Sequence, residues 1–187
     1  LALAMNVLGK PDSRDWESLP DDGVDYRAGL EAGAKGLRVA ISPGLGYVAL
    51  DPEVEEAVRA AATLYSDLGA QVSEATPEIG NPIDPYYILV RLAARALVDS
   101  VPEDQWALLV EELRKDAADA DNHNAMDVKH AEMEQRRLGA VMNRFFEAFD
   151  VLVTATVAVP AFGAADDDPS GDKRIGLGWT GTSYPFN

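Results

Sequence analysis

The segment from Gly36 to Pro77 constrains the fold more than any other part of the chain. It begins with Leu37 to Ser42, a short apolar run followed directly by a proline and a glycine, as expected of a buried strand. Asp51 is a good N-cap and Pro52 fits the first helical position, so an amphipathic helix should follow. A second apolar run, Val72 to Thr76, comes after that helix. Because one helix joins the two runs, we expect parallel strands and an α/β fold, a mostly parallel sheet covered by helices.

The next part of the chain has helical periodicity and little strand signal. The apolar spacing predicts three helices, over Tyr86–Val101, Glu103–Ala118 and Met126–Phe149. They have no strand partner, so we expect a three-helix insert. Val151 to Val157 is then a nearly continuous apolar run, which predicts a strand of a sheet covered on both faces.

Four blocks of the sequence resemble amidase-signature hydrolases, and they occur in that family's order. The last block, Trp179 to Asn187, contains Tyr-Pro-Phe-Asn, which resembles a segment before the family's final strands. One departure is Ala155, which stands where the family commonly has proline. The other three blocks are Leu1 to Pro20, Val24 to Pro43 and Phe149 to Phe162. The resemblance covers nearly the whole chain.

The resemblance also implies a catalytic site that this chain does not contain. The family uses a Ser–cis-Ser–Lys triad with both serines in a Gly/Ser-rich stretch, whereas the serines here are scattered and none is bracketed by glycines. We therefore expect no catalytic residue in this chain, which we interpret as an internal fragment of a longer amidase. The nucleophile would precede residue 1, and the fragment alone would be inactive.

As a fragment, the chain should form one partial amidase-signature domain. Its expected parts are a helix tail and loop at 1–25, a βαβ unit at 26–77, the helical insert at 78–149, and a late strand and loop at 150–187.

Four residues near the last predicted strand are candidate substrate contacts. They are Thr154, Thr156, Trp179 and Tyr184, at and after the carboxyl end of the strand, where open α/β sheets place ligands. Thr154 and Thr156 should share one face of the strand, because side chains alternate along it. The alternative is that the aromatic residues are core anchors and the threonines are ordinary strand residues.

Composition excludes several other classes of function. A net charge of −16 argues against nucleic acid binding, which needs basic patches. Zero cysteines exclude a thiolate nucleophile, and no apolar run approaches the roughly 20 residues that span a bilayer. His123 and His130 read as solvated helix surface, so we expect no metal and no cofactor.

Two classes of function remain open from the sequence. The first is part of a cytoplasmic enzyme acting on a small-molecule amide, with no nucleic acid or membrane partner. The second is a non-catalytic α/β binding or scaffolding module. In either case, exposed sheet edges should favour a homo-oligomer, because unpaired strand edges seek partners.

Overall fold

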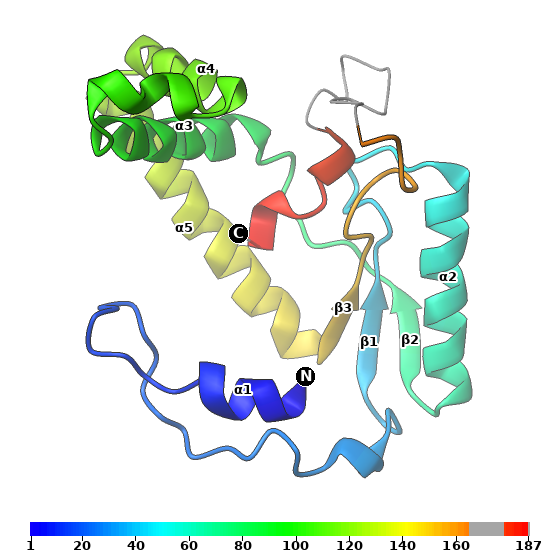
Figure 1. Ribbon diagram of the computed structural model, residues 1–187. Coiled ribbons are helices and arrows are strands. Elements are labelled where there is room, and N and C mark those ends of the chain that lie inside the picture. The colour runs from blue at the N-terminus through cyan, green and yellow to red at the C-terminus, as the bar shows by residue number, and fades with distance from the viewer. Residues whose placement is uncertain (165–177, 187) are drawn as a thin grey trace.

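The architecture is a small parallel sheet with helices packed against it and a helical insert standing beside it (Figure 1). A computed structural model describes residues 1–164 and 178–186. Its strands are β1 (Arg38–Ile41), β2 (Gln71–Glu74) and β3 (Val151–Val153), arranged in the order β2-β1-β3. Val39 aligns with Val72 on one side and with Val151 on the other, both in parallel register. The predicted parallel pairing of the first two strands is therefore confirmed.

Helix α2 (Pro52–Asp67) connects the first two strands and begins where its capping residue predicts. The Asp51 carboxylate accepts a hydrogen bond of 2.9 Å from the backbone N–H of Glu53, so one of the unpaired amides of the first turn is satisfied. The chain leaves the helix through Gly69, whose φ of 88° is a left-handed conformation that glycine adopts without strain. The helix packs against β1 and β2.

The helical insert consists of α3 (Ile83–Asp99), α4 (Glu111–Asp119) and α5 (Ala125–Ala148). In Figure 1, α3 and α4 stand at the upper left, and α5 runs from them down to β3. The start of α5 is fixed by a capping box, in which the side chains of Asn124 and Asp127 each bond to the other's backbone N–H. The expected three-helix insert is thus present.

The second predicted helix, Glu103–Ala118, is wrong in detail. The structure has a 3₁₀ helix at Glu103–Leu108, an extended backbone at Leu109 and Val110, and only then α4. The break has a packing reason. It lets Trp106 and Leu109 before α4 and Leu113 within it all reach one buried cluster, made of Ala94, Val98 and Ala117. Tertiary contacts have overridden the local helical pattern.

The last predicted strand, Val151–Val157, is also corrected, because β3 ends after three residues. β1 ends in a turn, in which the N–H of Leu45 donates to the carbonyl of Ser42. The carbonyl oxygen of Pro43 in this turn accepts two hydrogen bonds, from the hydroxyl of Thr154 at 3.0 Å and from the backbone N–H of Ala155 at 3.1 Å. A proline at position 155 would lack that N–H. Thr154 and Thr156 therefore do not share the face of a regular strand.

An ion pair fixes the start of β3 beside the start of β1. The Arg38 guanidinium forms a double hydrogen bond with the Asp150 carboxylate, at 2.6 and 3.1 Å, and also donates to the carbonyl of Glu147 at 2.9 Å. These hydrogen bonds lower the pKa of Asp150 from its ordinary 3.8 to about 2. This pairing was not predictable from the sequence, because the two residues are 112 positions apart in the chain.

The two ends of the chain lie outside the sheet. Helix α1 (Ala2–Leu8) begins an arm that passes through a 3₁₀ helix at Leu30–Ala32 before β1. Two more 3₁₀ helices, Gly178–Thr180 and Tyr184–Phe186, follow the stretch 165–177, which lies outside the described residues and holds most of the predicted late loop. Within the described ranges, no helix combines the length and apolarity needed to cross a bilayer.

Candidate functional site

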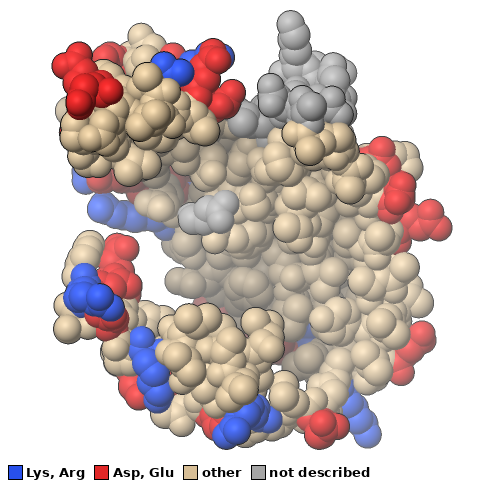
Figure 2. All heavy atoms as spheres, viewed as in Figure 1, with Lys and Arg blue, Asp and Glu red and all other residues tan. Residues whose placement is uncertain are grey.

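An apolar groove lies where α3, α5 and the final 3₁₀ helix meet. Its volume is about 610 Å³. The side chains that line it come from the two helices of the insert and from the C-terminal segment: Pro82, Pro85, Tyr86, Leu89, Val90, Ala93, Gln135, Leu138, Gly139, Met142, Asn143, Phe146, Tyr184, Pro185 and Phe186. None of these residues is charged, although 26% of the chain is Asp, Glu, Lys or Arg. Acidic side chains gather instead over α4 and along α2 (Figure 2).

Helical spacing explains why these residues face one another. On α5, Gln135, Gly139, Met142 and Phe146 recur at intervals of three or four, so they form one face of the helix. The same spacing on α3 brings its own lining residues to the groove. Leu138, which is 8% exposed, joins this face to a buried core cluster. The groove is therefore an extension of the core that remains open to solvent.

Tyr184 forms the aromatic wall of the groove at its C-terminal side. Its ring is 5% exposed and stacks on Tyr86, with 4.2 Å between centroids and 16° between planes. Its hydroxyl accepts from Thr180 at 3.1 Å and lies 3.3 Å from that of Tyr87. Burial raises the pKa of Tyr87 and of Tyr86, so both hydroxyls stay neutral. Tyr86, which lines the groove, therefore adds no charge to it.

Hydrogen bonds to the sheet side of the molecule also hold the segment that carries Tyr184. The Tyr47 hydroxyl donates to the carbonyl of Gly181 at 2.7 Å, and the buried Thr182 hydroxyl donates to the carbonyl of Thr156 at 3.0 Å. The N–H of Ala158 donates to the carbonyl of Trp179 at 2.7 Å. Because the partners come from the β1–α2 loop and the segment after β3, the groove wall is fixed by the sheet as well as by the insert.

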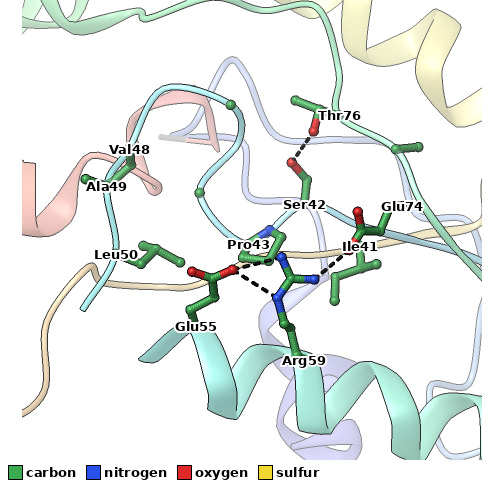
Figure 3. Close-up of a pocket in the computed structure, with 13 residues that line it drawn as sticks. Ile41, Ser42, Pro43, Val48, Ala49, Leu50, Glu55, Arg59, Glu74 and Thr76 are labelled. Atoms are coloured by element: carbon green, nitrogen blue, oxygen red, sulfur yellow. Dashed lines mark hydrogen bonds and ion pairs between the residues drawn. The ribbon is translucent and has the colours of Figure 1, made fainter. Parts of the chain in front are cut away.

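A second hollow lies at the carboxyl ends of β1 and β2 and is of a different kind (Figure 3). Its volume is about 670 Å³. On one side the hydroxyl of the buried Ser42 and that of the exposed Thr76 bond to each other at 2.7 Å. On the other, Arg59 from α2 pairs with Glu55 at 2.8 Å and also with Glu74. The polar side chains of this sheet-end hollow are thus already paired with one another.

The loop that borders the sheet-end hollow is tightly turned. At Gly44 a Cβ would collide with the carbonyl oxygen of Val48, so glycine is required by close backbone approach. Leu45 has a φ of 54° and is 2% exposed, so its side chain packs into the core. The conformation of this loop therefore places Leu45 in the hydrophobic core.

The four predicted substrate contacts do not gather at one place. Tyr184 lines the groove. Thr154 is engaged with the Pro43 carbonyl, and Thr156 is exposed. Trp179 is half-buried and packs edge-on against Phe162, with 5.2 Å between ring centroids. The assignment of substrate contacts to these four residues stays a prediction, and Tyr184 alone among them lies in a hollow that can hold an apolar ligand.

The hydroxyls of Ser42 and Ser100 are not arranged as nucleophiles. That of Ser42 pairs with Thr76, and that of Ser100 donates to the carbonyl of Leu97 at 2.6 Å. Neither partner is a general base, which an attacking serine requires. Among the described residues there is also no cluster of three His, Cys, Asp or Glu side chains that could hold a metal ion.

Most of the groove was missed by reasoning from the sequence. Leu89, Leu138, Met142 and Phe146 contribute to the apolar spacing that predicts two of the helices, but that spacing does not show that they line a groove. The available signal was Gly139, a helix-breaking residue within an otherwise helical and apolar stripe.

Comparison with known proteins agrees with the resemblance in the sequence. The family model described as Amidase matches residues 1–187. The acylamidase of Rhodococcus erythropolis is 30% identical over 195 residues, which cover 100% of this chain and 40% of that protein. An amidase of Pseudomonas putida is 29% identical over 161 residues, covering 86% of this chain and 34% of the relative.

The fold of the chain also agrees with that of a solved structure. The crystal structure of a bacterial aryl acylamidase belonging to the Amidase signature enzymes family superposes with a TM-score of 0.77, at 23% identity, over 89% of this chain and 36% of that one. This confirms the predicted α/β fold. The chain spans about 40% of the length of the acylamidase it matches.

Proposed function

This chain belongs to the amidase family, and we propose that it supplies the binding groove of an enzyme that hydrolyses neutral amides. The observation that carries the proposal is the uncharged, apolar groove between α3, α5 and the final 3₁₀ helix. Its volume of about 610 Å³ falls within the range of small-molecule sites. A charged ligand would find no counter-ion among its lining residues, whereas an apolar substituent would gain free energy by leaving water.

We further propose that hydrolysis proceeds through a serine acyl-enzyme. A serine oxygen attacks the amide carbon, the C–N bond breaks, and the amine leaves with a proton. Water then cleaves the resulting ester and regenerates the serine. Backbone N–H groups would stabilise the oxyanion. The nucleophile would lie outside this chain, which fits the hydrogen-bond partners of Ser42 and Ser100.

The proposal is tested with hexananilide, a neutral amide with apolar groups on both sides. This chain should release no aniline and should not react with a fluorophosphonate that labels activated serines. The complete product of its gene should do both. Aniline release by the 187-residue chain that disappears in the Ser42→Ala variant would place the nucleophile in this chain and contradict the proposal. If the complete product binds hexananilide without hydrolysing it, the alternative of a non-catalytic binding module is correct.

We also propose that two copies can pair through the open strand edges. In the described sheet β2 and β3 are the outer strands, and each has one side without a strand neighbour. Light scattering at increasing concentration checks this, and a monodisperse monomer throughout would contradict it. The cytoplasmic location expected from the sequence stays a prediction.

A further inference from the structure

Gly139 is an unexpected residue for the middle of α5. That helix is 24 residues long and regular, and glycine is the least favourable helix residue after proline because it loses the most backbone freedom. It lies in the centre of the helix face that lines the groove, one turn after Gln135 and one turn before Asn143. The position therefore needs an explanation beyond helix formation.

Neither backbone conformation nor packing requires glycine there. Gly139 is not among the residues with positive φ. A Cβ built on it meets no heavy atom of the described residues within 4 Å. Gly44 shows the contrast, because a Cβ there would strike the carbonyl oxygen of Val48. Gly139 is itself exposed, so what its missing side chain provides is open space along the lining of the groove.

We propose that Gly139 sets the depth of the groove and thereby selects amides that carry an extended apolar substituent. The inference rests on the proposed function, since it concerns the same groove. Gly139 is itself a lining residue, so a side chain at this position would take up part of the space in the groove, over the preceding turn that carries Gln135. The polar side chains of α5 in the lining, Gln135 and Asn143, are neutral amides, so the selected ligand is uncharged.

The test measures binding of two anilides to this chain by titration calorimetry. Hexananilide carries a longer acyl group than acetanilide, and the wild-type chain should bind it at least about ten-fold more tightly, because more apolar surface is buried. Gly139→Leu should weaken hexananilide binding by about ten-fold or more and leave acetanilide binding unchanged. Gly139→Ala should weaken hexananilide binding by about three-fold. Ala140→Leu is the matched control, since this exposed neighbour is not a lining residue and its variant should bind as the wild type does.

Thermal unfolding gives a second, independent readout. Gly139→Ala should raise the melting temperature by about 2–4 °C, because alanine favours the helix and its Cβ meets no obstacle. A lower melting temperature would show that glycine is needed for packing and would overturn the inference. So would hexananilide binding that is equal in the wild type and Gly139→Leu, or no preference of the wild type for the longer anilide.

The result is separable from the proposed function. If the complete gene product hydrolyses no amide but Gly139 still controls the preference for the longer anilide, the inference stands and the enzymatic proposal fails. If the complete product hydrolyses anilides with the same preference in wild type and Gly139→Leu, the inference fails alone.

Discussion

The apolar groove and the sheet-end hollow have similar volumes and opposite chemistry. The sheet-end hollow measures about 670 Å³ and contains the Ser42–Thr76 hydroxyl pair and the Arg59 ion pairs. The groove measures about 610 Å³ and has an uncharged, mainly apolar lining. Size therefore does not distinguish a binding site from a gap in packing. The two sites differ in their lining: the sheet-end hollow is lined by polar side chains that already have partners, and the groove is lined mainly by apolar side chains.

This difference has an energetic basis. A ligand in the sheet-end hollow would have to compete with hydrogen bonds and ion pairs that the protein already makes, so each new contact would replace an old one. A ligand in the groove removes apolar surface from water, at about 25 cal/mol for each Å² buried, without breaking any of them. The groove is consequently the better site for a neutral ligand, and the sheet-end hollow belongs to the fold.

The largest expected effect comes from removing the groove wall. Tyr184→Ala should lower the free energy of unfolding by about 3 kcal/mol, because it deletes a buried ring stacked on Tyr86. It should also weaken hexananilide binding. Tyr184→Phe keeps the ring and loses only the hydroxyl contacts, so about 1 kcal/mol should be lost and binding should remain. Urea unfolding measures the change in the free energy of unfolding, and calorimetry measures the change in hexananilide binding. Equal effects of the two variants on binding would show that the ring is not the wall.

A smaller effect is expected in the sheet-end hollow. Thr76→Val removes the hydroxyl partner of Ser42, which is 2% exposed and would be left unsatisfied. The free energy of unfolding should fall by about 1–3 kcal/mol. Thr63→Val is the control, because its hydroxyl donates to the Arg59 carbonyl on the exposed side of α2. Hexananilide binding should be unchanged in both variants, and weaker binding in Thr76→Val would break the distinction between the hollows.

The smallest effect is a pH dependence at the start of the sheet. The pKa of Asp150 is lowered in the folded state to about 2, so its pairing with Arg38 stabilises the fold above its ordinary pKa of 3.8. That stabilisation is lost as the pH falls from about 4 to about 2. Asp150→Asn lacks it at every pH. The difference in melting temperature between wild type and variant should therefore be largest above about pH 4 and smallest below about pH 2. A melting-temperature difference that stays constant across this pH range would contradict the assignment of the stabilisation to the Arg38–Asp150 pair.

The parts that were predictable from the sequence are those that local chemistry decides. Asp51, Pro52 and Gly69 define α2, and the apolar runs on either side of it define β1 and β2. The end of β3 was not predictable, because Pro43 acts on it from far away in the chain. Ala155 is an example, because only the structure shows that its backbone N–H donates to the carbonyl of Pro43.

The site was less predictable than the fold for the same reason. The groove exists because α3 and α5 pack together and the C-terminal segment closes one side of it. Periodicity identifies an apolar helix face but not whether another element covers it fully. Proximity to a strand end led to Thr154, Thr156 and Trp179, which the structure places outside the lining of the groove. Tyr184 lies in it because hydrogen bonds to Tyr87 and Thr180 and stacking on Tyr86 hold it there.

The account's central claim is that the uncharged groove, and not the sheet-end hollow, binds a neutral amide. The most direct measurement is a titration of the ¹⁵N-labelled chain with hexananilide, followed by amide NMR shifts. We expect the largest shifts at Gly139, Met142 and Tyr184, with little change at Ser42, Glu55 and Thr76. Shifts concentrated on the second set, with the first unchanged, would contradict the claim.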